Sequence, residues 1–117
     1  MKNVLKPVSA ATAEHYTWGE VCDGWRLLKE EQLSVIQERV PPGGAEVMHF
    51  HSRARQFFYV LSGIATLELA DGAVTFGAGE GVHVPPGIPH RFRNNTGADV
   101  VFLVISAPST EGDRTLV

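Results

Sequence analysis

The feature that most constrains this chain is a succession of short apolar stretches separated by turn-forming residues. No stretch repeats apolar residues at helical spacing over three turns. Many short strands with turn residues between them are typical of β-sandwiches and barrels. The sequence therefore predicts an all-β domain, with strands in the ranges 24–29, 32–40, 46–51, 56–61, 64–69, 73–76, 81–84, 90–94 and 100–106.

Glycine and proline clusters mark the turns between these stretches. Asp71 and Gly72 stand between two alternating runs, which predicts a two-residue β-hairpin at this point. Gly43 and Gly63 also lie at expected turns, where a positive φ suits a residue without a side chain.

The length of 117 residues accommodates one domain. Apolar residues make up 44% and charged residues 20%, a composition typical of a folded chain rather than a disordered one. We divide the chain into an irregular N-terminal arm that packs on the barrel (1–24), the barrel itself (25–107) and a C-terminal tail (108–117). A short helical turn is expected at Ala10–His15. The tail is either free or a strand exchanged with a partner.

Charge and cysteine content limit the partners and the compartment. A formal net charge of −3 argues against nucleic-acid binding. The lone Cys22 excludes an internal disulfide and a zinc site built on several thiolates. The N-terminus lacks the apolar region of a secretory signal, and the longest apolar run, Val100–Ile105, is too short to span a membrane. We therefore expect a cytoplasmic protein that binds neither nucleic acid nor membranes.

Two histidines lie two residues apart in a strand-like stretch. Side chains alternate between the faces of a strand, so His49 and His51 leave the same face, while Phe50 points to the other. Two imidazoles placed in this way can bind one metal ion.

Two longer patterns surround these histidines. The stretch from Gly43 to Gly63 resembles the first cupin motif, G-x5-H-x-H-x4-E-x6-G, except that Gln56 stands where the motif has glutamate. The stretch from Gly79 to Asn94 resembles the second motif, G-x5-P-x-G-x2-H-x3-N, at every fixed position. The resemblance covers residues 33–106, about two thirds of the chain.

The resemblance to cupins implies a small jelly-roll barrel, or double-stranded β-helix, with one divalent metal ion inside. Carried over position by position, the metal ligands are His49, His51, Gln56 and His90. Zn, Ni, Fe or Mn suits such a set of nitrogen and oxygen donors. Four protein ligands leave open coordination positions, which is typical of catalytic or ligand-binding sites.

The glutamine at position 56 changes the electrostatics of the implied site. A glutamine carbonyl is a neutral donor, so a divalent ion bound there keeps its full charge. We expect weaker metal binding and stronger attraction for an anionic or enolisable oxygen ligand. The alternative is that Gln56 only fills the pocket.

Strand alternation extends the site to further residues. Phe58, Val60 and Phe92 share the face of the ligands and are expected to wall a largely apolar pocket. His83 is expected at the pocket wall or as an additional ligand. Glu46 is out of phase with His49 and is expected to face away.

Other charged side chains remain outside the predicted site. Arg91 and Arg93 are expected to point outward into surface ion pairs, and the facing of Glu38 stays open.

Three functions fit this sequence. The first is a metal-dependent enzyme that acts on a small oxygenated substrate, enolisable or anionic, by Lewis-acid isomerisation or cyclisation. The second is an Fe(II) dioxygenase, and the third is a non-catalytic cupin that binds a small molecule. We favour the first. A homodimer is expected, because exposed edge strands of small barrels are usually covered.

Overall fold

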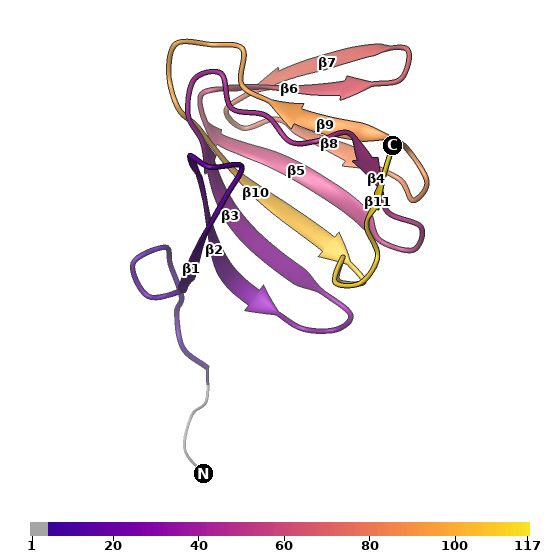
Figure 1. Cartoon of the computed structure of the whole chain (residues 1–117). Coiled ribbons are helices and arrows are strands. Elements are labelled where there is room, and N and C mark those ends of the chain that lie inside the picture. Colours follow the sequence, from indigo (N-terminus) through magenta and orange to yellow (C-terminus); the bar gives the residue numbers. More distant parts are fainter. Residues whose placement is uncertain (1–4) are drawn as a thin grey trace.

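The computed structural model describes residues 5–117 as two antiparallel sheets (Figure 1). The six-stranded sheet has the order β1 (Glu14–Trp18), β2 (Cys22–Lys29), β3 (Ser34–Val40), β10 (Val100–Ala107), β5 (Arg55–Ser62) and β8 (Gly81–Val84). The five-stranded sheet has the order β11 (Thr115–Leu116), β4 (His49–Phe50), β9 (His90–Arg93), β6 (Ile64–Leu69) and β7 (Gly72–Gly77). The predicted all-β jelly roll is confirmed.

The core lies between the inner faces of the two sheets. In strand β10, buried and half-buried residues alternate along the whole length, so one face of the strand points into this core. Its Phe102 stacks on Phe92 of β9 in the other sheet, with 3.9 Å between ring centroids. Burying an aromatic side chain of this kind contributes about 2–3 kcal/mol. Contacts of this type hold the sheets together and leave one end of the sandwich for polar groups.

The predicted turns are confirmed, with one shift in register. Gly43 and Gly63 have φ angles of 81° and 86°. Strands β6 and β7 form a two-residue hairpin, but Leu69 pairs with Gly72, so the loop is 70–71 rather than Asp71–Gly72. Neither loop residue has a positive φ among the described residues, so the glycine extends the strand instead of turning the chain.

The N-terminal arm is more regular than the sequence suggested. A hydrogen-bonded turn at Ser9–Ala13 takes the place of the expected helical turn. Strand β1 follows it and pairs with β2, which itself crosses the boundary placed at residue 24. The prediction of an irregular arm is therefore wrong for the residues of β1 and for the part of β2 before residue 25. Residues 1–4 lie outside the described part of the chain. No helix within residues 5–117 is long and apolar enough to cross a membrane.

The C-terminal segment lies against its own barrel. Strand β11 pairs with β4, and the Asp113 side chain before it is buried. A second buried anchor is Asn94 of the second cupin-like motif, whose Nδ2 donates to the carbonyls of Val40 (2.9 Å) and Ala98 (2.7 Å). Both anchors tie loops to the frame that carries the histidines.

Candidate metal centre

Three buried histidines meet at one end of the sandwich. His49 of β4 pairs directly with His90 of β9, and His51 follows immediately after β4. One ring nitrogen from each histidine lies within 4.8 Å of the others. The structure thus brings together the three histidines that the resemblance assigned as metal ligands.

The neighbours of each ring fix which nitrogen faces the site. In all three histidines Nδ1 lies within hydrogen-bond distance of a backbone carbonyl, which can only accept, so Nδ1 carries the proton. The acceptors are the oxygens of Val47 for His49 (2.7 Å), Ile88 for His90 (2.8 Å) and Asp113 for His51 (2.6 Å). Burial lowers the pKa of His49 to about 4 and also lowers that of His90, so these rings are neutral near pH 7. The Nε2 atom of each histidine then presents a free electron pair.

The residues present fit a divalent metal ion. Among the described residues, the buried side-chain atoms without a hydrogen-bond partner are His51 Nε2, His90 Nε2 and Gln56 Oε1. Buried polar atoms are normally satisfied, so this set marks a place where something else binds. Ser106 Oγ accepts from Gln56 Nε2 at 3.2 Å, which leaves the amide oxygen as the free group. Three imidazole nitrogens and one amide oxygen suit Zn, Ni, Fe or Mn.

Glu46 lies beside the histidines, which corrects the expectation that it faces away. Its Oε2 is 4.0 Å from His49 Nε2, and its Oε1 accepts from the backbone N–H of Phe92 at 3.0 Å. Burial raises the pKa of Glu46. The expectation failed because strand β4 begins only at His49, so the two-residue alternation does not extend back to position 46.

A second carboxyl group, Glu38, reaches the same space from the opposite sheet. The hydroxyl of Tyr16 donates to Glu38 Oε2 at 3.2 Å. Burial, reinforced by the charge of Glu46, raises the pKa of Glu38 to about 8. The alternation of β3 contained the signal for Glu38, because Val40 and Ser34 share its face and are buried. Tyr16 could not be found in this way, since β1 was not predicted.

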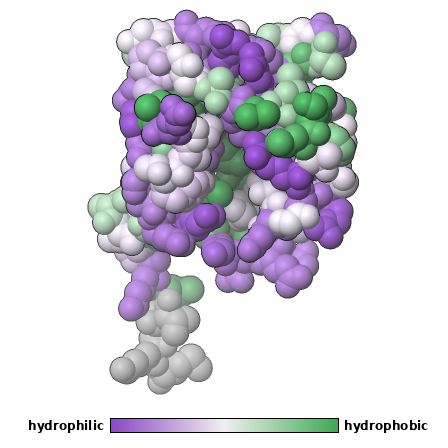
Figure 2. All heavy atoms as spheres, viewed as in Figure 1, coloured by the Kyte–Doolittle hydropathy of each residue, from purple (hydrophilic) through white to green (hydrophobic). Residues whose placement is uncertain are grey.

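These groups, apart from His90, line one cavity of about 200 Å³. It is lined by residues of both sheets and of the C-terminal segment: Tyr16, Arg26, Ile36, Glu38, Glu46, His49, His51, Gln56, Phe58, Val104, Ser106, Thr110 and Arg114. A neighbouring cavity of about 430 Å³ shares Tyr16, Glu38, Glu46 and Arg114 with it. Figure 2 shows a face of the molecule that is hollowed near its middle, with apolar atoms at the floor of the hollow. The polar lining means that the pocket is less apolar than the sequence suggested.

The predicted pocket residues occupy different places. Phe58 lines the cavity. Val60 and Phe92 are fully buried in the core and are absent from the cavity lining. His83 is exposed, because it pairs with Phe57 and shares the outer face of the six-stranded sheet. The expectation that His83 lines the pocket is therefore wrong.

The outward-facing arginines behave as predicted. Arg91 and Arg93 both pair with Glu68, at 2.9 Å in each case.

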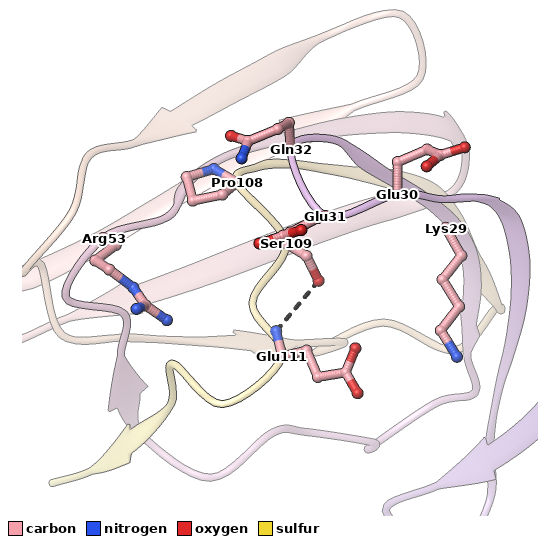
Figure 3. Close-up of a pocket in the computed structure, with 8 residues that line it drawn as sticks. All are labelled: Lys29, Glu30, Glu31, Gln32, Arg53, Pro108, Ser109 and Glu111. Atoms are coloured by element: carbon pink, nitrogen blue, oxygen red, sulfur yellow. Dashed lines mark hydrogen bonds between the residues drawn. The ribbon is translucent and has the colours of Figure 1, made fainter.

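A larger hollow of about 520 Å³ lies beside the start of the C-terminal segment. Figure 3 shows its lining, which is made of Lys29, Glu30, Glu31, Gln32, Arg53, Pro108, Ser109 and Glu111. The hydrogen bond drawn there joins the backbone N–H of Glu111 to Ser109 Oγ at 3.2 Å. None of the unpaired buried atoms faces this lining. Buried atoms without a hydrogen-bond partner are thus a better guide to the functional site here than cavity volume. The cavity beside the histidines is therefore the candidate site.

The fold and the histidine centre agree with the comparison with known families. The Cupin domain family matches residues 36–106. The chain belongs to this family of double-stranded β-helix proteins.

Several known proteins resemble this chain in sequence or in structure. An uncharacterised protein, MJ1618, from Methanocaldococcus jannaschii is 24% identical over 89 residues, which cover 76% of this chain and 71% of that protein. The polyketide cyclase RemF from Streptomyces resistomycificus is 25% identical, with a TM-score of 0.80 over 91% of this chain and 81% of its own. A sugar phosphate isomerase of the cupin superfamily from Silicibacter pomeroyi is 23% identical, with a TM-score of 0.77 over 89% and 76%. The last of these likenesses shows the fold alone.

Proposed function

We propose that this protein is a metal-dependent cupin enzyme that isomerises or cyclises a small oxygenated substrate, enolisable or anionic. The observation that carries the proposal is that the unpaired donors of His51 and Gln56 share one cavity with two carboxyl groups and a phenol. The unpaired Nε2 of His90 belongs to the same histidine cluster. His49, His51, His90 and Gln56 would hold the ion. A divalent ion bound there supplies a Lewis acid that polarises a substrate oxygen.

The chain itself supplies groups that can exchange protons with a substrate. Isomerisation and cyclisation through an enol both require a proton to be removed from one atom and delivered to another. Glu38, with a pKa near 8, can hold a proton at neutral pH, and Tyr16 donates to it. Glu46 lies on the other side of the cavity, next to His49. These groups favour acid–base chemistry over the dioxygenase alternative.

Positive charge at the cavity supports an anionic substrate. The lining includes Arg26 and Arg114, and the implied ion adds a double charge because Gln56 is neutral. The descriptions of RemF as a polyketide cyclase and of the Silicibacter pomeroyi protein as an isomerase are compatible with this class of reaction.

The first test is the metal content of protein purified without an affinity tag or chelator. We expect about one equivalent of Zn, Ni, Fe or Mn by elemental analysis, because the four donors form one site. His51→Ala and His90→Ala should each lose it. His83→Ala is the matched control and should retain it, since that ring is exposed on the outer face. Protein that takes up no metal even after reconstitution would overturn the proposal.

The second test concerns the reaction. The loaded protein should exchange substrate C–H protons for deuterium in D₂O, or isomerise, with at least one member of a panel of 1,3-diketones, 2-oxo acids and aldose phosphates, followed by ¹H NMR. Glu38→Gln should slow this exchange while retaining the metal. Oxygen uptake with the same panel would support the dioxygenase instead. Tight retention of a compound without turnover would support the non-catalytic binder.

A further inference from the structure

The three histidines differ in what orients them. For His49 and His90, the carbonyl that accepts from Nδ1 lies two residues earlier in the chain, so each ring is held by its own loop. For His51 the acceptor is the carbonyl of Asp113, 62 residues away and 2.6 Å from Nδ1. The orientation of His51 therefore depends on a distant segment that no cupin motif in the sequence includes.

The side chain of Asp113 binds the loop that follows His51. The Asp113 carboxylate accepts hydrogen bonds from the backbone N–H groups of Ser52 (2.8 Å), Arg53 (2.9 Å) and Ala54 (2.9 Å). Asp113 is 7% exposed, so water competes little for these bonds. Hydrogen bonds to a charged acceptor are about twice as strong as neutral ones. One residue thus fixes both the ring of His51 and the backbone that follows it.

The residues after Asp113 extend the contact to His49. In β11, Leu116 pairs with His49 and Thr115 pairs with Phe50. The N–H of Val117 donates to the carbonyl of Met48 at 3.2 Å. Figure 1 shows this segment beside β4, in yellow near the C-terminus. The segment 113–117 consequently follows the chain from residue 48 to residue 54.

We propose that Asp113 is the positioning residue of the metal centre, because its carboxylate holds the loop after His51 while its carbonyl selects the Nδ1–H form of that ring. This choice leaves His51 Nε2 free to bind a metal. Groups that hydrogen-bond to metal ligands typically change metal affinity by about 10- to 100-fold when they are removed. The inference rests on the proposed function only in taking the histidines as ligands.

The first experiment needs no metal. In ¹H–¹⁵N correlation spectra of the metal-free protein, all three histidines should show the Nδ1–H form. Asp113→Ala should shift His51 towards a mixture of both forms, while His49 and His90 keep theirs. Asp113→Asn retains one acceptor oxygen and should give an intermediate spectrum. Glu111→Ala, an exposed carboxylate in the same segment, is the matched control and should change none of the three.

The second experiment measures Zn²⁺ affinity by competition with a chromophoric chelator. Asp113→Ala should weaken binding about 10- to 100-fold, Asp113→Asn less, and Glu111→Ala by under twofold. If a folded Asp113→Ala or Asp113→Asn variant keeps both the wild-type spectrum of His51 and the wild-type affinity, the proposal is wrong. Failure of the wild type to bind any of Zn²⁺, Ni²⁺, Fe²⁺ and Mn²⁺ overturns the proposed function, whereas the spectra still decide the role of Asp113.

Discussion

Gln56 is the residue at which this chain departs from the cupin motif. Its amide oxygen is buried without a partner, while its nitrogen donates to Ser106. This arrangement presents a neutral oxygen to the cavity. The single substitution relative to the motif therefore alters the charge of the site without altering the number of donors.

Restoring the acid at this position should strengthen metal binding. A Gln56→Glu variant places a negative charge next to the implied ion, so Zn²⁺ affinity should rise by roughly tenfold or more. Competition with a chelator measures the change. The control is Gln37→Glu, which adds the same charge to β3 on the face opposite Glu38. Equal or tighter binding by the glutamine form would contradict this account of the site.

The histidine cluster could be predicted from the sequence, and the neighbouring Glu46 and Tyr16 could not. Fixed spacing identified His49, His51 and His90, because the motif encodes which residues the two sheets bring together. Glu46 was misplaced, since it lies outside any strand and side-chain alternation has no meaning there. Tyr16 was missed, because its place in the cavity depends on a sheet pairing that no local pattern encodes.

At the level of elements, the nine predicted strands are all present, and β1 and β11 were missed. The strand β11 is two residues long, too short to show alternation. The strand β1 mixes polar and aromatic residues and is exposed over much of its length. Both are edge strands, which are held by one neighbour and need no apolar run. Their contribution to the site is nevertheless direct.

The placement of β1 depends on a glycine. Gly24 of β2 pairs with Tyr16, and a Cβ built at Gly24 would collide with the Tyr16 ring. The guanidinium of Arg26 stacks on that ring, 4.4 Å from its centroid. The bare backbone at Gly24 thus lets the phenol reach Glu38.

Filling this space should displace the ring. Gly24→Ala is expected to lower the free energy of unfolding by about 1–3 kcal/mol, measured by urea denaturation, because overpacking forces neighbours to move. Gly72→Ala is the matched control: a Cβ there meets nothing within 4 Å, and its φ is not positive. That variant should stay within about 0.5 kcal/mol of the wild type. A neutral Gly24→Ala variant would show that the ring is not confined.

At the scale of the whole molecule, the half-buried Glu38 couples folding to pH. Its pKa is raised to about 8 in the folded protein, so the protonated form is the one that folding favours. The contribution of Glu38 to the free energy of unfolding is complete below the pKa near 4.5 that this side chain has in the unfolded chain. It is lost as the pH rises towards 8. Tyr16, Glu46 and Arg26 face the group and set the size of the effect.

Removing the titrating group should remove this part of the pH dependence. Between pH 5 and pH 8, the wild type should lose about 3–4 kcal/mol more of its unfolding free energy than Glu38→Gln. Urea denaturation at several pH values measures the difference, which cancels contributions common to both proteins. Glu111→Gln, which changes an exposed carboxylate of the C-terminal tail, should follow the wild type. Parallel curves for the wild type and Glu38→Gln would show that Glu38 is ionised when folded.

The homodimer and the cytoplasmic location stay predictions. The outer face of the six-stranded sheet carries apolar side chains, among them Phe57 (40% exposed) and Leu61 (44% exposed). The mass in solution, compared with 12.7 kDa for one chain, decides the oligomeric state.

The position of Tyr16 on an edge strand has an evolutionary consequence. The histidines come from β4, β9 and the loop between β4 and β5, whereas Tyr16 belongs to β1, which pairs only with β2. Replacing or remodelling such a strand leaves the histidine frame intact. A lineage can therefore remodel the wall of the cavity by exchanging its first strand while it keeps the histidine cluster unchanged.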